Sequence, residues 1–401
     1  MARLKVGILL ILLFSITFAL LVGGTMPYFL LYILLLILIL PLVHILVTLK
    51  GLKGSVKVPE RSLFTGDSVE ISYSIKNNSI FGITFLEVQS DISKKLTGID
   101  SPIVALSLEK GDSFSNRETI HLKRRGYYEL GEIKVTIKDV FGFYSFTKKI
   151  SGQTSLLVYP ETISLSTFKI TTSQQLGELL IKDSVFQDKS RITSLREYIE
   201  GDSVKDIHWR LSAKKDNLIV KDYENRGDTY AIVLVDNYVN IFKDDVDRHL
   251  EDKAVDAALS IVNYCLSNNI EVKLATQNHK EYLEINGQQK SDLKPFLEIL
   301  ARFKGNGTLD FTSFLIPRIE TLRKGSTAII ITPNLDKSMG AHGILLKSKN
   351  LNPLFILITD MENKTGNIDQ MIEKKLRQEG IPIYILDHKS STKDLLEAYH
   401  G

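Results

Sequence analysis

Two uncharged apolar runs dominate the first fifty residues of this 401-residue chain. Residues 6–22 carry no charge, and residues 28–49 carry none when His44 is counted as neutral. A helix needs about 20 apolar residues to cross the hydrocarbon core of a bilayer, so both runs are candidate spans, joined by the short connection GGTMP. A secretory signal peptide is the competing interpretation of the first run, but no small-x-small cleavage site precedes the second. We therefore expect residues 1–50 to form a transmembrane helical hairpin.

Basic residues flank this hairpin on its two outer sides, and the connecting loop carries no charge. They are Arg3 and Lys5 before the first run, and Lys50, Lys53, Lys57 and Arg61 after the second. Positive residues favour the cytoplasmic side of a membrane. The pattern therefore predicts a multi-pass protein of the cell membrane, with both ends and the soluble domains in the cytoplasm.

Apolar and polar positions alternate with a period of two from residue 55 to residue 159. SVEISYSIKN and YYELGEIKVTIKD have this pattern, and clusters of Gly, Asn, Asp and Ser separate such segments. The alternation predicts half-buried strands, and the clusters predict turns. Several short strands with no helical run between them predict an antiparallel, Ig-like β-sandwich over residues 55–159.

Residues 229–401 have a different pattern, in which continuous apolar runs alternate with amphipathic segments. TYAIVLVDN, STAIIITPN, PLFILITDME and IPIYILDH are typical of buried strands, and the segments between them include amphipathic helices. This order predicts a mainly parallel sheet covered on both faces, as in doubly wound, Rossmann-like α/β domains. The mixed residues 160–228 are expected to dock on this domain as a joint.

Composition narrows the functional classes. The net charge is only +3, and basic and acidic residues are interspersed between residues 191 and 221. A nucleic-acid binder usually has a concentrated basic stripe, so no nucleic-acid partner is expected. The single cysteine, Cys265, excludes a disulfide framework and lies in an apolar helical pattern typical of a core residue.

No glycine-rich phosphate loop follows the first strand of the α/β domain, and no cofactor is expected. GNGT, at residues 305–308, opens a helix and is a weak candidate for anion binding.

The chain's most reactive side chains gather in REYIEGDSVKDIHWRLSAKKDNLIVKDYE, from Arg196 to Glu224. Asp202, Asp206 and His208 are the groups that a hydrolase would use here. Asp206 and His208 are only two positions apart, however, and on one helix they would point to different faces. This spacing argues against the base–orienter pair that activates a serine.

A structural role for the same stretch explains it better. Ser203 is placed to cap a helix running through IHWRLSAK, with Asp206 completing a capping-box-like pair. The Gly-Asp-Ser triplet also occurs at Gly66–Ser68 and Gly111–Ser113, where it leads into expected strands as ordinary turn chemistry. We therefore expect a turn, a capped helix and a strand, with Ile207 and Trp209 buried.

The order of elements after residue 229 resembles a von Willebrand factor A domain. In that family Asp-x-Ser-x-Ser at the end of the first strand, a Thr from a GGT-like loop and a later Asp coordinate Mg²⁺. The matching positions here are Asp236, Tyr238, Asn240, Thr308 and Pro333. Only Asp236 and Thr308 keep the family's residue types, so we expect a degenerate remnant and no metal site.

The stretch from Arg196 to Glu224 resembles the signature of the domain of unknown function 58 family, approximately R-E-Y-x-x-G-D-x-x-R-x-I-x-W-x-x-S-A-[KR]. Upstream, RRGYYELGEIKVTIKDVFGFY resembles a second pattern of that family. The signature residues expected to form a joint or docking surface are Arg196, Glu197, Tyr198, Gly201, Asp202, Asp206, Ile207, His208, Trp209, Arg210, Ser212, Ala213 and Lys214.

The resemblance implies an architecture and a partner. The architecture is a membrane-anchored hairpin, a β-sandwich and a degenerate von Willebrand factor A-like domain. Such proteins are commonly paired with MoxR-type AAA+ ATPases, which implies a non-enzymatic scaffold that helps to assemble or deliver a client protein at the membrane. The alternative is a hydrolase that uses Asp202, Asp206 and His208.

Overall fold

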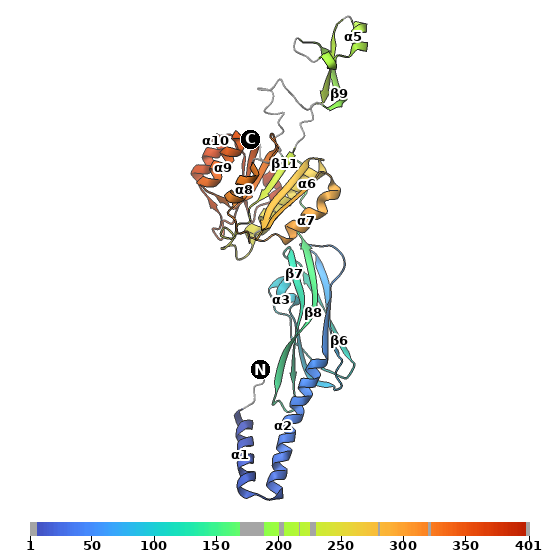
Figure 1. The fold of residues 1–401 in the computed structure, drawn as a ribbon, viewed down its shortest axis with the longest axis vertical. Coiled ribbons are helices and arrows are strands. Elements are labelled where there is room, and N and C mark those ends of the chain that lie inside the picture. Colours follow the sequence, from blue (N-terminus) through green and yellow to red (C-terminus); the bar gives the residue numbers. More distant parts are fainter. Residues whose placement is uncertain are drawn as a thin grey trace. The chain divides into compact units, whose positions relative to one another are not determined.

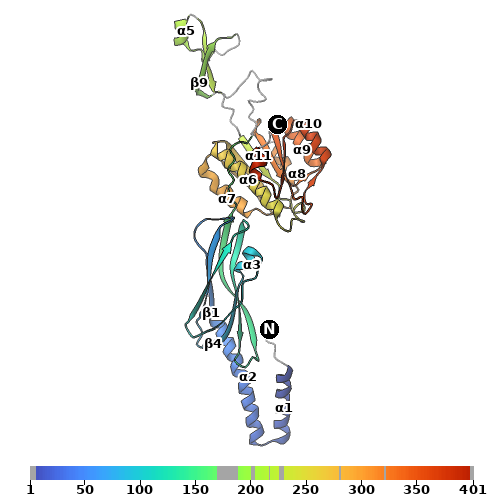
Figure 2. The same cartoon turned by 180° about the vertical axis from the view of Figure 1, so that it is seen from behind.

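The computed structural model describes residues 6–168, 188–199, 204–215, 217–224, 230–279, 281–319 and 322–397. The chain divides into two compact units, Met1–Glu161 and Thr162–Gly401, here called the N-terminal unit and the C-terminal unit. Figures 1 and 2 show the elements of each unit from two sides.

The N-terminal unit begins with two apolar helices, α1 (Val6–Val22) and α2 (Thr25–Gly51). Helix α2 is long and apolar enough to cross a membrane, and the shorter apolar stretch Leu10–Val22 lies within α1. Gly23 and Gly24 connect the helices with positive φ angles of 66° and 82°, which favour glycine. Strand β1 (Leu52–Lys57) follows α2 with no intervening residue.

The rest of this unit consists of two sheets, with the strand orders β1-β3-β6 and β2-β8-β7-β4-β5. All their pairings are antiparallel except that of β2 with β8. The remaining elements are β2 (Leu63–Phe64), β3 (Ser68–Asn77), β4 (Ile83–Ser90), α3 (Ile92–Thr97), β5 (Val104–Leu108), β6 (Ser113–His121), β7 (Gly126–Lys138) and β8 (Ser145–Tyr159).

One hydrophobic core joins both sheets of the N-terminal unit. It contains Ile71 and Ile75 of β3 together with Val88 of β4 and Val135 of β7. Burial alternates along β3, as the period-two pattern predicts. The turn role expected of the first two Gly-Asp-Ser triplets is confirmed, because β3 begins at Ser68 and β6 at Ser113, each after a glycine with positive φ.

The last turns of α2 pack into the same core. Ile45 and Leu49 are members of it, and the ammonium group of Lys148 donates to the carbonyl oxygen of Leu49 at 2.9 Å. His44 lies against the loop after β3, with Nε2 2.9 Å from the carbonyl oxygen of Gly82. The expected span of residues 28–49 therefore includes positions that pack on the sheets.

The C-terminal unit contains a six-stranded sheet with the order β13-β12-β11-β14-β16-β18. Its strands are β11 (Tyr230–Val235), β12 (Glu271–Asn278), β13 (Glu281–Gly287), β14 (Thr327–Thr332), β16 (Asn352–Thr359) and β18 (Ile383–Asp387). Only β13 runs antiparallel to its neighbour. Every residue of β11 and β14 is buried, as expected for strands covered on both faces.

Helices cover this sheet in two groups. The first contains α6 (His249–Ser267), α7 (Leu293–Arg302) and α11 (Thr392–Glu397), and the second contains α8 (Phe311–Ile319), α9 (Lys337–Ser348) and α10 (Gln370–Gln378). Side chains of the second group share a core with Ile232 and Leu234 of β11. The sequence-based expectation of a mainly parallel sheet with amphipathic helices is confirmed for this unit. Strands β15 (Asn334–Leu335) and β17 (Asn367–Ile368) form a separate two-stranded sheet. The 3₁₀ helix η2 (Lys290–Asp292) precedes α7 in the chain.

A separate two-stranded antiparallel sheet precedes these elements in the chain. It consists of β9 (Asp188–Glu197) and β10 (Ile219–Glu224), which are connected through η1 (Val204–Asp206) and α5 (Trp209–Lys215). We call the described residues from 188 to 224 the signature hairpin.

Candidate functional site

The carboxyl ends of β11 and β14 form the topological switch point of the large sheet. The chain leaves β11 to build β12 on one side, and β14 lies on the other side. Open α/β sheets bind ligands beyond such points. Asp236 follows β11 here, and Thr332 ends β14.

Asp236 is completely buried at this point. Its Oδ2 accepts a 2.7 Å hydrogen bond from the Thr332 hydroxyl, and its Oδ1 accepts one of 3.0 Å from the backbone amide of Tyr238. Burial raises the pKa of Asp236 to about 6; the two donors lower it, whereas the nearby Asp310 and Asp336 raise it further. A buried carboxyl group with a raised pKa at a switch point is typical of a functional residue.

The other residues matched to the Mg²⁺ site have different hydrogen-bond partners. The Thr308 hydroxyl donates to the carbonyl oxygen of His279 at 3.1 Å, and the Asn240 amide donates to the Tyr238 hydroxyl at 2.6 Å. Asp336, three residues after Pro333, accepts from the Met339 amide and caps α9. Asp236 and Thr308 thus have separate hydrogen-bond partners.

The GNGT loop is closely packed against its own unit. A Cβ atom on Gly305 would overlap Phe242, and one on Gly307 would overlap Asn237. The amide of Gly305 donates to the Glu251 carboxylate at 2.8 Å, and that of Gly307 donates to the carbonyl oxygen of Asn237 at 2.9 Å. These amides already have acceptors, so the structure gives no support to anion binding at this loop.

A second group of polar side chains lies at the carboxyl ends of β16 and β18. Asp360 follows β16, His388 follows β18, and His249 is the first residue of α6. Nδ1 of His249 is 2.8 Å from Oδ2 of Asp360, and Nδ1 of His388 is 3.2 Å from Oδ1. The two imidazole rings stack with 4.4 Å between centroids and an interplanar angle of 2°. We call these three residues the histidine cluster.

Asp360 is the centre of this cluster. Asn363 donates to it twice, from its backbone amide at 3.0 Å and from its side chain at 2.9 Å. Burial alone would raise the pKa of Asp360, but the hydrogen bonds from Asn363 and His249, together with His388, outweigh burial and hold the pKa well below its usual range. Asp360 is therefore ionised at neutral pH.

No sequence pattern singles out the histidine cluster, although part of its signal is present in the sequence. ITD and ILDH end two apolar runs that were both assigned as strands. Because β16 and β18 are parallel neighbours, their ends lie together. The adjacency of these strands, and the position of His249 at the start of α6, become known only from the fold.

The signature hairpin has a buried side and an exposed side. Ile207 pairs with Val220 and is buried, and the Ser212 hydroxyl accepts from the Ile219 amide at 2.9 Å and donates to the His208 carbonyl oxygen at 3.1 Å. Ser212 thereby fastens α5 to β10. Trp209, at the start of α5, is 61% exposed.

Two expectations for this hairpin are corrected. Trp209 is exposed, because the hairpin's short helix turns its first residue outward, whereas Ile207 and Ser212 fill the contact with β10. The helix begins at Trp209, after a separate 3₁₀ turn, and Nδ1 of His208 accepts from the Leu211 amide at 3.2 Å. His208 thus caps α5, which begins later than the single helix expected from residue 203 onward; Ser203 itself lies outside the described residues.

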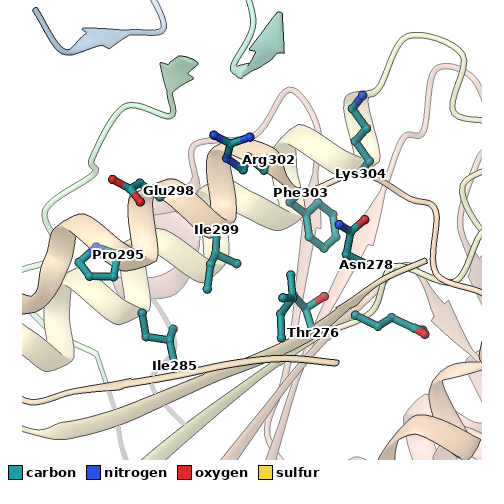
Figure 3. A pocket seen from close by; sticks show the side chains of 11 residues that line it. Thr276, Asn278, Ile285, Pro295, Glu298, Ile299, Arg302, Phe303 and Lys304 are labelled. Carbon is teal, nitrogen blue, oxygen red and sulfur yellow. The ribbon is translucent and has the colours of Figure 1, made fainter. Parts of the chain in front are cut away.

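A surface pocket of about 340 Å³ lies between α7 and the β12–β13 hairpin, as Figure 3 shows. Ile285 and Ile299 give it apolar walls, and Glu298, Arg302 and Lys304 contribute charged groups. The lining contains no cysteine, histidine or serine that would act as a nucleophile or its base.

Comparisons with known proteins identify one region of the chain. Residues 194–332 match the family model "Protein of unknown function DUF58". The chain carries a DUF58 segment. "Uncharacterized protein YeaD" of Bacillus subtilis (strain 168) is 22% identical over 265 residues, which are 65% of this chain and 64% of that protein. The match therefore covers slightly less than two thirds of that relative.

Two solved structures are similar to parts of the chain. The "von Willebrand factor type A from Catenulispora acidiphila" has a TM-score of 0.31 and 11% identity, covering 45% of this chain and 42% of that one. The CARDB domain of the PF1109 protein from Pyrococcus furiosus has a TM-score of 0.19 and 16% identity, covering 27% of this chain and 94% of that one. At scores this low, the strand orders above remain the basis for describing the fold.

The DUF58 segment contains all of the expected signature residues. Arg196, Glu197 and Tyr198 lie at the end of β9 and just after it, where the Tyr198 amide donates to the Leu218 carbonyl oxygen at 2.8 Å and the Asn217 amide group is 3.4 Å from the Glu197 carboxylate. Arg210, Ala213 and Lys214 lie on α5 with exposed side chains, and Asp206 ends η1. Gly201, Asp202 and Ser203 lie outside the described residues.

The DUF58 segment includes Asp236, Thr308 and Thr332 of the switch point. It includes His249 of the histidine cluster but ends before Asp360 and His388. The family is described as one of unknown function, and that description names no activity.

Proposed function

We propose that the chain is a non-enzymatic, membrane-anchored adaptor. Helices α1 and α2 anchor it in the bilayer as a two-span hairpin, and the sandwich-like pair of sheets and the von Willebrand factor A-like unit lie in the cytoplasm. There the DUF58 segment binds a MoxR-type AAA+ ATPase, and the assembly acts on a client protein at the membrane. The length and apolar composition of α2 support the anchor.

The exposure of Trp209 is the observation that carries this proposal. It is the chain's only tryptophan, yet it is largely exposed, whereas Ile207 and Ser212 supply the hairpin's internal contacts. Ile199 and Leu218, which lie near each other through the Tyr198–Leu218 hydrogen bond, are exposed as well. Tryptophan is enriched among the residues that dominate binding energy in protein interfaces. The signature hairpin thus has the features of a docking element.

The experiment uses the full chain in lipid nanodiscs and a purified MoxR-type AAA+ ATPase from the same organism. We expect binding in the presence of ATP and at least a tenfold loss of affinity in Trp209→Ala, with an unchanged melting temperature. Phe85→Ala is the matched control, because Phe85 is another exposed aromatic residue, on a strand of the N-terminal unit. Equal binding by both variants, or a large loss of stability in Trp209→Ala, would contradict the docking role.

The hydrolase alternative uses Asp202, Asp206 and His208. Its histidine has one ring nitrogen occupied by the Leu211 amide, as expected for a helix cap. His208→Ala should leave ATPase binding nearly intact under the adaptor proposal. Turnover of an ester, peptide or glycan substrate that His208→Ala abolishes in a folded chain would support the enzyme instead.

A further inference from the structure

The histidine cluster brings three potential metal ligands together from three separate elements. The ligand atoms offered by His249, Asp360 and His388 all lie within 4.8 Å of one another. The residues belong to the start of α6 and to the ends of β16 and β18. The group is separate from the Asp236–Thr308 remnant and from the signature hairpin that carries the proposed adaptor function.

We propose that the histidine cluster binds one divalent transition-metal ion, with Zn²⁺ as the best match. Two imidazole nitrogens and one carboxylate oxygen form the ligand set that protein sites with three residues and one open position use for zinc. Mg²⁺ and Ca²⁺ prefer sites made of oxygen ligands alone, so the two histidines favour a softer ion.

The spacing of the donor atoms fits this ion. With bonds of about 2.1 Å, neighbouring ligands of a tetrahedral zinc ion lie about 3.4 Å apart. Nδ1 of His388 and Nδ1 of His249 are 3.2 Å and 2.8 Å from the two Asp360 oxygens. The rings are stacked, so a rotation of His249, whose side chain is 33% exposed, is needed to direct both nitrogens at one point. The ion would then replace the hydrogen bond between His249 and Asp360.

The surroundings of the cluster support a cation in two ways. Asn363 holds the Asp360 carboxylate through two hydrogen bonds, as outer residues commonly orient metal ligands. Three carboxylates surround His388, since Asp387 and Glu362 are each 3.7 Å from its ring nitrogens in addition to Asp360. Lys389 pairs with Glu362, and Lys253 interacts electrostatically with Asp387, so Asp360 is the carboxylate left to the two histidines.

The ion has access to the site from solvent. The Asp360 side chain is 1% exposed and that of His388 is 11% exposed, whereas His249 is partly open to solvent. His249 therefore lies at the entrance and Asp360 at the base. The open coordination position faces the His249 side and would hold a water molecule or a side chain of a partner.

The test measures binding of Co²⁺ and Zn²⁺ to the full chain in detergent, produced without a polyhistidine tag and stripped with a chelator. We expect one Co²⁺ per chain, with the visible absorption bands of a low-coordinate Co²⁺ site, and displacement of Co²⁺ by Zn²⁺. His388→Gln and Asp360→Asn should each weaken Co²⁺ binding at least tenfold and lose these bands. Zn²⁺ should raise the melting temperature of the natural chain and leave that of His388→Gln unchanged.

His342→Ala is the matched control, because His342 is a histidine outside the cluster. It lies on α9, and its ring is hydrogen-bonded to the Ser338 carbonyl oxygen. It should bind Co²⁺ as tightly as the natural chain. If Asp360→Asn does not fold, His388→Gln still decides the question. Absence of stoichiometric binding, or equal affinity in folded His388→Gln, overturns the metal site and leaves a hydrogen-bonded cluster. Binding of the ATPase is measured separately, so either proposal can fail without the other.

Discussion

Asp236 shows how a single buried carboxyl group affects stability. Its folded-state pKa of about 6 lies above the ordinary value of 3.8, so the folded chain binds the proton more tightly than the unfolded chain. The contribution of Asp236 to stability is therefore greatest below about pH 4, falls as the pH rises from about 4 to about 6, and stays lower above that. Functional residues often reduce stability in this way.

Asp236→Asn should stabilise the C-terminal unit at neutral pH. The amide has no charge to bury, and the Thr332 hydroxyl can donate instead to the Asn334 carbonyl oxygen, 3.2 Å away. The gain in the free energy of unfolding should be at most about 3 kcal/mol above pH 6 and should vanish below pH 4. Hydrogen exchange of the β11 and β14 amides at several pH values measures it. Asp247→Asn, at an exposed position, is the charge-matched control, and an advantage of equal size at pH 4 and pH 7 would contradict the assignment.

For individual residues, the sequence predicted which stretch stands out better than it predicted which side chains are buried or cap a helix. The stretch from Arg196 to Glu224 was singled out correctly, and Ile207 is buried as expected. Trp209 was expected in the core because tryptophan is mostly buried, but a seven-residue helix has too little surface to cover it. The sequence predicts one continuous helix over this stretch, whereas a 3₁₀ turn precedes α5, which begins at Trp209 with His208 as its cap.

Among the elements, helix α2 has two environments along its length. Its first part exposes most of its apolar side chains, and its last turns enter the core of the N-terminal unit. Hydropathy alone could not divide the helix, because the residues that meet the sheets are as apolar as those expected to meet lipid. Strand alternation and the mainly parallel character of the large sheet were predictable, whereas the meeting of His249 with Asp360 and His388 depended on which strands are neighbours.

Ile45→Ala should destabilise the N-terminal unit by about 2–5 kcal/mol, since Ile45 is fully buried and truncation leaves a cavity. Leu46→Ala, one position further along the same helix, removes a side chain that is 44% exposed and should have a much smaller effect. Hydrogen exchange of the β1 and β7 amides in detergent measures both. Equal effects of the two substitutions would mean that the helix end does not pack on the sheets.

For the whole molecule, the proposed orientation can be mapped with thiol chemistry. Cys265 is buried, and burial raises the pKa of its thiol to about 12, so the folded chain should react little with maleimides. Thr25→Cys, at the first residue of α2, should be labelled by an impermeant maleimide in intact cells. Asp244→Cys, exposed in the C-terminal unit, should be labelled only after permeabilisation. The reverse pattern would overturn the cytoplasmic assignment.

The direct junction of α2 with β1 has a mechanical consequence. With its last turns held in the core, the part of α2 from Thr25 to Val43 is about 28 Å long at 1.5 Å per residue, close to the thickness of a bilayer's hydrocarbon core. Transmembrane helices respond to changes in membrane thickness by tilting. No flexible segment separates α2 from β1. In the anchored chain, a thinner or thicker membrane would therefore tilt α2 and rotate the attached sheets with it. Local lipid composition would thus set the direction in which these sheets point.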